Sequence, residues 1–186
     1  MMLIEYGEDI IAIDVGLMFP EEEMLGVDLV IPDFTYLREH SDRLRAIFLT
    51  HGHEDHVGAL PYLLREFTAP VYSTRLTDGL IRVKLNEHRL LDKAETHVVE
   101  PGEVIKAGVF EVEFFPVAHS IHDACGLIIR TPLGPIVHTG DFKLDQTPVM
   151  NQATDLIRLA QVGAEGCLLL LADSTYAEVE GYTPSE

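Results

Sequence analysis

The sequence predicts a mixed α/β fold in which stacked β-sheets are faced by helices. Apolar, β-rich runs outnumber helical patterns along the chain, and these runs come in neighbouring pairs typical of hairpins. A purely parallel, doubly wound sheet would instead alternate single strands with long helices. With 186 residues, of which 47% are hydrophobic, and with no repeat or linker, the chain is expected to form one domain over residues 1–186.

The first half of the chain begins with a predicted hairpin. Met2–Tyr6 and Ile10–Val15 are β-rich runs joined at Gly7, and the second run puts Asp14 at a strand end. Beyond the stretch that Pro32 interrupts, the apolar spacing predicts five further elements. These are a short helix over Tyr36–His40, a strand over Ala46–Leu49, a helix over Val57–Phe67 with Pro61 in its first turn, a strand over Val71–Ser73 and a helix over Thr74–Leu85.

The second half is predicted to consist mainly of strands. They lie near Val98 and over Val104–Ile105, Phe110–Val117, Cys125–Arg130 and Ile136–His138, and a helix follows over Ala153–Val162. The apolar run Cys167–Ala172 is too short to span a bilayer and is predicted to form a buried strand.

The charge of the chain limits the surfaces it can offer to a partner. Thirteen Lys and Arg residues face 31 Asp and Glu residues, which gives a formal net charge of −18. This balance argues against a broad phosphate-binding surface built from these residues alone. Most of the acidic excess, including Glu21, Glu22 and Glu23, is expected to be solvated surface, and bound divalent cations would offset part of it.

The two cysteines indicate the redox setting. Cys125 and Cys167 lie far apart, form no CxxC pair and follow no secretory signal pattern, so a reduced, cytoplasmic setting is expected. Both thiols are expected to be core residues.

A cluster of histidines follows the predicted strand Ala46–Leu49. Within six residues, His51, His53, Asp55 and His56 place three imidazoles and one carboxylate at a strand-to-helix junction. Neutral imidazole and carboxylate suit Zn²⁺ or a similar divalent ion. A loop would let His51 and His53 bind one ion while Asp55 and His56 bind a second; the alternative is that the histidines only cap a helix or lie exposed.

Two more candidate ligands lie at the ends of later predicted strands. His119 follows the strand that ends at Val117, and Asp141 follows His138. Asp141 alone would be an ordinary turn residue beside Gly140, but two ions need more than four ligands. His138 is expected to support the turn that carries Asp141 rather than to bind metal.

These motifs, taken together, resemble those of the metallo-β-lactamase superfamily, and within it the ribonuclease J family. The superfamily motifs are the HxHxDH cluster of residues 51–56, the later His119 and the Thr-Gly-Asp sequence that ends at Asp141. The finer resemblance rests on Asp14-Val15-Gly16-Leu17-Met18-Phe19-Pro20, Leu25-Gly26-Val27-Asp28, His119-Ser120-Ile121, His138-Thr139-Gly140-Asp141-Phe142-Lys143, Asp173-Ser174-Thr175 and Thr183-Pro184-Ser185-Glu186. It covers essentially the whole chain and implies the αββα metallo-β-lactamase fold.

The resemblance also implies a role for each motif residue. One metal ion would be held by His51, His53 and His119, the other by Asp55 and His56, and Asp141 would bridge the two. Asp14 would orient the histidine loop without binding metal, although its residue type at a strand end also fits an ordinary turn. Asp55 and Asp173 are the expected catalytic residues, Asp173 by orienting a proton-donating histidine, and Ser174 and Thr175 are possible phosphate contacts.

The activity that the resemblance implies is metal-dependent hydrolysis of RNA. Such enzymes combine 5′ to 3′ exonuclease and endonuclease activity in RNA processing and decay, use two divalent ions, here Zn²⁺ or alternatively Mn²⁺, and form dimers or tetramers. The chain would be the amino-terminal part of the metallo-β-lactamase domain, with a β-CASP insertion and a last metal-binding histidine expected beyond Glu186. Three alternatives stay open: a DNA-processing β-CASP nuclease, a hydrolase of thioesters, lactams or lactones, and an inactive metal-binding fragment.

Overall fold

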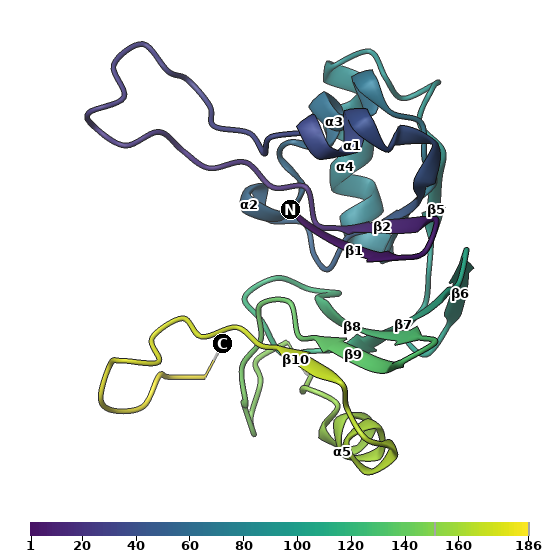
Figure 1. Ribbon diagram of the computed structural model, residues 1–186. Helices are drawn as coiled ribbons and strands as arrows, with labels where there is room; N and C mark the ends of the chain where they lie inside the picture. Colours follow the sequence, from purple (N-terminus) through teal and green to yellow (C-terminus); the bar gives the residue numbers. More distant parts are fainter. Residues whose placement is uncertain (151, 186) are drawn as a thin grey trace. The chain divides into compact units, whose positions relative to one another are not determined.

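The computed structural model describes residues 1–150 and 152–185, so Glu186, the last residue of the Thr183 motif, lies outside the described residues. The chain forms two compact units, residues 1–99 and residues 100–186. Each unit contains one five-stranded sheet; several helices accompany the first sheet and one helix accompanies the second, as Figure 1 shows. The predicted α/β class is therefore confirmed.

The sheet of the first unit is mostly parallel. Its order is β1-β2-β3-β4-β5, with β1 antiparallel to β2 and each later pair parallel. The strands are β1 (Met2–Tyr6), β2 (Asp9–Ile13), β3 (Leu44–Phe48), β4 (Val71–Ser73) and β5 (Thr96–Val98). Because β2 and β3 are parallel, their carboxyl ends lie at the same edge, where ligands commonly bind in such sheets. The β1–β2 hairpin turns at Gly7, whose positive φ of 60° suits a tight hairpin turn.

Helices follow the strands of the first unit. They are α1 (Thr35–Glu39), the 3₁₀ helix η1 (Ser41–Arg43), α2 (Glu54–Val57), α3 (Leu60–Glu66) and α4 (Arg75–Glu87). Figure 1 shows α1, α3 and α4 together on one side of the sheet. Buried side chains of β2 and β3, among them Ile10 and Ile47, pack with Leu37, Leu60 and Ile81 of these helices to form the core.

The sheet of the second unit is mostly antiparallel. Its order is β10-β9-β8-β7-β6; β6 to β9 form an antiparallel meander and β10 is parallel to β9. The strands are β6 (Val104–Ala107), β7 (Phe110–Pro116), β8 (Cys125–Thr131), β9 (Gly134–His138) and β10 (Leu169–Leu171). Because β7 and β9 are both antiparallel to β8, they run in the same direction. Their carboxyl ends therefore lie at the same edge of the sheet.

One helix, α5 (Leu156–Glu165), packs against this second sheet. Its Val162 and Leu159 contact a cluster that includes Phe115 and Val137. The Asp155 side chain caps the helix by accepting a hydrogen bond of 2.8 Å from the backbone N–H of Arg158. The Arg158 guanidinium also donates to both carboxylate oxygens of Glu113 on β7, at 2.6 and 2.7 Å.

Several expected boundaries differ from the structure for identifiable reasons. The helix expected over Val57–Phe67 is two helices, α2 and α3, because the Ala59 N–H donates to the carbonyl of Val15. The strand expected to reach Val15 ends at Ile13. Asp14 still donates its N–H to the Phe48 carbonyl of β3, but it has a positive φ of 51°, and the Val15 N–H donates to the carbonyl of His56 instead. The helix expected over Ala153–Val162 begins at Leu156, after its Asp155 cap.

The prediction of a buried strand over Cys167–Ala172 was wrong about burial. A strand is present as β10, but Leu168, Leu169 and Leu170 are 53%, 47% and 58% exposed. Within the described residues β10 pairs only with β9 and forms the edge of its sheet. Cys167 is likewise exposed, contrary to expectation, whereas Cys125 is buried as expected and burial raises the pKa of its thiol to about 12.

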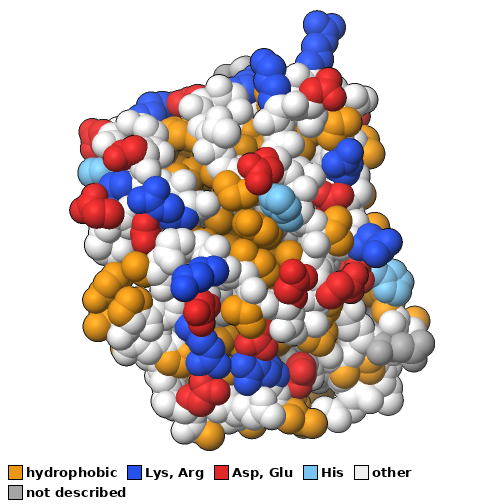
Figure 2. Space-filling view, turned by 90° about the vertical axis from the view of Figure 1, so that its right-hand side faces the viewer, with side chains coloured by type: hydrophobic (Ala, Val, Ile, Leu, Met, Phe, Trp, Pro, Cys, Tyr) orange, Lys and Arg blue, Asp and Glu red, His pale blue; other side chains and the backbone are white. Residues whose placement is uncertain are grey.

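Charged side chains of both signs are mixed on the surface. On the face in Figure 2, Lys and Arg side chains lie among Asp and Glu side chains, with hydrophobic groups between them. Glu21, Glu22 and Glu23 are exposed, as expected. Across residues 1–150 and 152–185, no helix combines the length and apolar character that crossing a membrane requires.

Candidate metal centre

The histidine cluster lies on the loop that joins β3 to α2. His51 is fully buried, His53 and His56 are partly buried, and Asp55 is exposed. His53 has extended backbone angles and directly precedes the short helix α2, which contains the other two residues. The strand-to-helix junction predicted from the sequence therefore brings the four side chains to the carboxyl end of β3.

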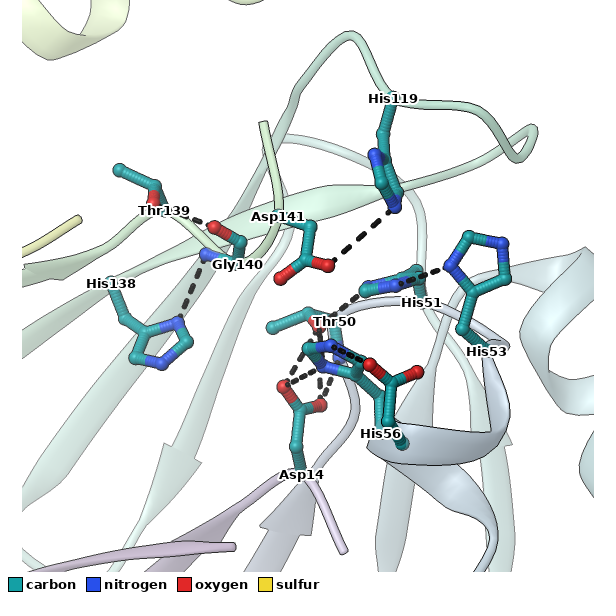
Figure 3. Close-up of polar contacts among 11 residues, drawn as sticks. Asp14, Thr50, His51, His53, His56, His119, His138, Thr139, Gly140 and Asp141 are labelled. Atoms are coloured by element: carbon teal, nitrogen blue, oxygen red, sulfur yellow. Dashed lines mark hydrogen bonds and ion pairs between the residues drawn. The ribbon is translucent and has the colours of Figure 1, made fainter. Parts of the chain in front are cut away.

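Asp14 holds this loop from the neighbouring strand end. It follows β2 and is 7% exposed. One of its carboxylate oxygens accepts the Thr50 N–H at 2.8 Å, and both oxygens lie within 3.1 Å of the Thr50 hydroxyl. The second oxygen also lies 2.8 Å from Nδ1 of His56 (Figure 3). Asp14 has a positive φ of 51°, an uncommon conformation that aspartate tolerates better than most residues.

These contacts fix the tautomers of two imidazoles. With the Asp14 carboxylate as its partner, Nδ1 of His56 carries the proton, which leaves the lone pair on Nε2. The single proton of the Thr50 hydroxyl goes to the same carboxylate, so Nδ1 of His51, 3.0 Å from that hydroxyl, must donate. Nε2 of His51 is then also an acceptor, as a metal ligand requires.

Backbone contacts hold the same loop against the segment after β2. The Val15 N–H donates to the His56 carbonyl at 2.6 Å, and the Leu17 N–H donates to the Glu54 carbonyl at 3.1 Å. Between them, Gly16 lies so close to α2 that a Cβ there would be 1.4 Å from the carbonyl oxygen of Asp55. Only glycine allows this approach, so the Asp-Val-Gly sequence positions the loop that carries the histidine cluster.

The distances between candidate ligand atoms fit metal coordination. Nε2 of His51 lies 3.0 Å from Nδ1 of His53, and Nε2 of His56 lies 3.8 Å from a carboxylate oxygen of Asp55. Neighbouring ligands of a tetrahedral Zn²⁺ with bonds near 2.0–2.1 Å are about 3.4 Å apart. Each pair is therefore near the separation that two ligands of one ion adopt. His51 belongs to two partly buried groups able to hold a metal ion, one with His53 and one with His56.

The second unit provides a similar pair. His119 follows β7 and Asp141 follows β9, and Nε2 of His119 lies 3.7 Å from a carboxylate oxygen of Asp141 (Figure 3). The turn before Asp141 is held by His138, whose Nδ1 accepts the Gly140 N–H at 3.0 Å. This contact agrees with the expectation that His138 supports the turn. Gly140 has a φ of 58° there, which favours glycine.

Asp173 lies at the end of β10 and is connected to the same turn. Its backbone N–H donates to the Thr139 hydroxyl at 3.0 Å, and its carboxylate accepts the Thr175 N–H at 2.8 Å. Ser174 and Thr175 are exposed. The predicted Asp-Ser-Thr motif therefore adjoins the turn that carries Asp141.

Two residues that position candidate ligands received no role from the sequence. Thr50 precedes the HxHxDH pattern, and Gly16 lies inside a recognised string whose glycine received no role. The signal that could have identified Thr50 is its position directly before the HxHxDH pattern, where a hydroxyl can contact the neighbouring histidines.

The chain belongs to the metallo-β-lactamase superfamily, whose family model matches residues 1–173. Over 186 residues it is 48% identical to ribonuclease J2 of Bacillus subtilis, a match that covers 100% of this chain and 34% of that protein. The resemblance to ribonuclease J predicted from the motifs is thus confirmed. The chain spans about a third of the length of this relative.

Solved structures agree on the fold. A protein of unknown function from Enterococcus faecalis matches with a TM-score of 0.67 and 23% identity, covering 98% of this chain and 48% of that one. Zn²⁺-bound PqqB from Methylobacterium extorquens matches with a TM-score of 0.56 and 13% identity, covering 97% of this chain and 64% of that one. The predicted metallo-β-lactamase fold is therefore confirmed.

Proposed function

We propose that this chain supplies the amino-terminal part of a two-metal active site that hydrolyses RNA phosphodiesters. The observation that carries the proposal is the arrangement of Asp14 and Thr50, which directs the lone pairs of His51 and His56 toward other candidate ligands. Such outer hydrogen bonds are typical of metal-binding histidines. The substrate class is supported by the 48% identity to ribonuclease J2, and the activity is proposed for the protein at its natural length.

The proposed ligand sets are those that the superfamily motifs imply. His51, His53 and His119 would hold one ion, Asp55 and His56 would hold the other, and Asp141 would bridge them. The nitrogen-rich donor set favours Zn²⁺, which is also the ion in PqqB, and Mn²⁺ is the alternative. When bound, two such ions bring the pKa of a coordinated water near neutral and offset charge on the attacked phosphate.

The residues of this chain would orient the ligands, the substrate and a proton donor. Asp14 keeps His56 and, through Thr50, His51 in the tautomer that carries its proton on Nδ1 and makes Nε2 the acceptor atom. Asp173 would orient the group that protonates the leaving oxygen, consistent with its link to the Asp141 turn through Thr139. Ser174 and Thr175 would contact the phosphate beside it.

The test is a substrate comparison with the protein at the length its gene encodes. We expect hydrolysis of 5′-monophosphorylated RNA that stops on chelation of divalent metal and returns with Zn²⁺ or Mn²⁺. DNA of the same sequence, a thioester and a lactam are the comparison substrates. Cleavage of DNA but not RNA would make the protein a DNA-processing nuclease, and turnover of the thioester or lactam without RNA cleavage would move it to the small-molecule hydrolases.

The proposal extends to partners and setting. By its resemblance to ribonuclease J, the protein would act on RNA in the cytoplasm, in RNA processing and decay, as a dimer or tetramer. The mixed charges on the face in Figure 2 favour local phosphate contacts near the metal ions over a broad basic surface. A single-subunit mass in solution at working concentration would contradict the oligomeric part alone.

A carboxylate at residue 14 is expected to be essential for metal affinity. Asp14→Asn keeps the shape but places an amide N–H₂ donor among the Thr50 N–H, the Thr50 hydroxyl and Nδ1 of His56. Either a buried donor loses its acceptor or His56 moves its proton to Nε2, where it blocks metal binding. We expect Zn²⁺ affinity to fall about 10- to 100-fold, measured by competition with a chelator.

Asp92→Asn is the matched control for this variant, because Asp92 is exposed and the charge change is identical. It should bind Zn²⁺ like the unsubstituted protein. Equal Zn²⁺ affinity in the Asp14 and Asp92 variants would contradict the orienting role of Asp14.

A further inference from the structure

The segments that carry His119 and Asp141 are joined by an unusual bridge. Just before His119, Ala118 forms an isolated antiparallel bridge with Lys143, two residues after Asp141. The Lys143 N–H donates directly to the Ala118 carbonyl at 2.9 Å. In a regular hydrogen-bonded antiparallel pair, the Ala118 N–H would donate directly to the Lys143 carbonyl in return.

That return bond passes through the hydroxyl of Thr154 instead. The Ala118 N–H donates to Oγ1 of Thr154 at 3.0 Å, and the hydroxyl donates to the Lys143 carbonyl at 2.8 Å. Thr154 is 8% exposed, so water does not readily replace this link. The hydroxyl therefore lies between the two segments and sets how far apart they are on this side of the bridge.

The neighbouring side chain holds the base of the His119 loop. Gln152 donates through Nε2 to the carbonyls of Val117 and Ala124, at 2.9 and 2.7 Å, on the two sides of that loop. The Asp155 N–H donates to the carbonyl of Pro116 at 3.0 Å. The short segment before α5 is thus bound to the end of β7 and to the Asp141 segment at once, and Thr154 is the residue that contacts both.

We propose that Thr154 is a positioning residue that sets the separation of His119 and Asp141, which is 3.7 Å between Nε2 and the nearest carboxylate oxygen. The inference rests on the proposed function, in which both side chains bind metal. A hydroxyl is required because one group must both accept from the Ala118 N–H and donate to the Lys143 carbonyl. Serine retains this capacity, whereas valine and alanine do not.

The test measures metal binding in the protein at the length its gene encodes. Zn²⁺ affinity is obtained by competition with a chelator, and the visible absorption of bound Co²⁺ reports ligand geometry without reference to activity. Thr154→Val is expected to weaken Zn²⁺ binding about 10- to 100-fold and to alter the Co²⁺ spectrum. Thr154→Ser should bind Zn²⁺ with an affinity within about twofold of the unsubstituted protein, a change much smaller than the roughly 10- to 100-fold expected for valine. Its Co²⁺ spectrum should match that of the unsubstituted protein.

A second threonine of the same unit provides the matched control. The Thr131 hydroxyl donates to the Gly134 carbonyl at 2.8 Å and accepts the Leu133 N–H at 3.1 Å, in the turn between β8 and β9. Thr131→Val removes a comparable link at the opposite end of β9 from Asp141. It is expected to lower the melting temperature of the metal-free protein while leaving Zn²⁺ affinity and the Co²⁺ spectrum unchanged.

The outcomes separate this inference from the proposed function. Thr154→Val that binds Zn²⁺ as tightly as the unsubstituted protein, with the same Co²⁺ spectrum, overturns the role of Thr154 alone. Absence of metal binding in the unsubstituted protein overturns the proposed function and this inference with it. If Thr154→Val does not fold, Thr154→Ala replaces it, since alanine removes the hydroxyl without placing a methyl group against the two backbone partners.

Discussion

In the protein at the length its gene encodes, replacing His53 with alanine is expected to reduce the proposed RNA hydrolysis by at least about 100-fold. Loss of residues that merely orient metal ligands already lowers activity about 10- to 100-fold, and His53 is proposed to bind the ion directly. The same loss is expected for Asp141→Ala. Nδ1 of His53 lies 3.0 Å from Nε2 of His51, and a carboxylate oxygen of Asp141 lies 3.7 Å from Nε2 of His119, so each variant removes one member of a close pair of candidate ligands. Metal content per chain should fall in parallel with activity.

The double variant tests whether both residues serve one centre. If His53 and Asp141 act on the same pair of ions, losing both should cost scarcely more than losing either, since residues that act as a unit are strongly non-additive. Multiplied losses would indicate two independent sites and contradict the proposed ligand sets.

The control for both single variants is His97→Ala. His97 lies on β5, about half-exposed, with Glu95 as its partner at 2.9 Å, and belongs to neither proposed set. Its replacement should change neither activity nor metal content.

Gly16→Ala is expected to disrupt the loop that carries the histidine cluster, although it adds a single methyl group. That carbon would lie 1.4 Å from the Asp55 carbonyl oxygen and 2.7 Å from the His56 nitrogen, both backbone atoms that cannot rotate away. The segment after β2 and the start of α2 must then separate, which breaks the Val15 and Leu17 hydrogen bonds to this loop. We expect a loss of about 3 kcal/mol in the free energy of unfolding, measured with denaturant, and loss of bound metal.

A second glycine separates this effect from a general response to alanine. Gly79 lies in α4, and a Cβ there would meet nothing within 4 Å. Gly79→Ala should leave metal binding unchanged and raise stability by about 0.5–1 kcal/mol, because alanine favours helix. Equal stability of the Gly16 and Gly79 variants would mean that the close approach at Gly16 has no energetic role.

The sequence predicted the strands and the ligand motifs well because both depend on local patterns. Alternating and apolar runs identified β2, β3, β7, β8 and β9 to within a few residues, and the HxHxDH spacing placed its side chains at a strand-to-helix junction. Boundaries were less accurate where backbone groups bond outside their own element. The ends of β2 and α2 depend on partners more than 35 residues away, such as the Val15 N–H and the His56 carbonyl.

What the sequence could not predict depends on close approach and on remote backbone partners. Gly16 and Thr154 are ordinary residue types whose importance comes from what lies beside them in the fold. The burial expected for Cys167–Ala172 was wrong because hydrophobicity indicates what a side chain would favour, not whether another element covers it. The roles of Gly16 and Thr154 can be assigned only once their neighbours in the fold are known.

Among the described residues β10 forms an edge of its sheet, which has a consequence for handling these 186 residues as a separate chain. Leu168, Leu169 and Leu170 combine strong β-forming character with exposure and carry no charge that would discourage pairing. A strand of this kind is a template for another strand, including one from a second molecule whose own β10 is equally accessible. Self-association through this edge would compete with productive folding at high protein concentration. A lysine in place of one of these leucines is the remedy that natural edge strands adopt.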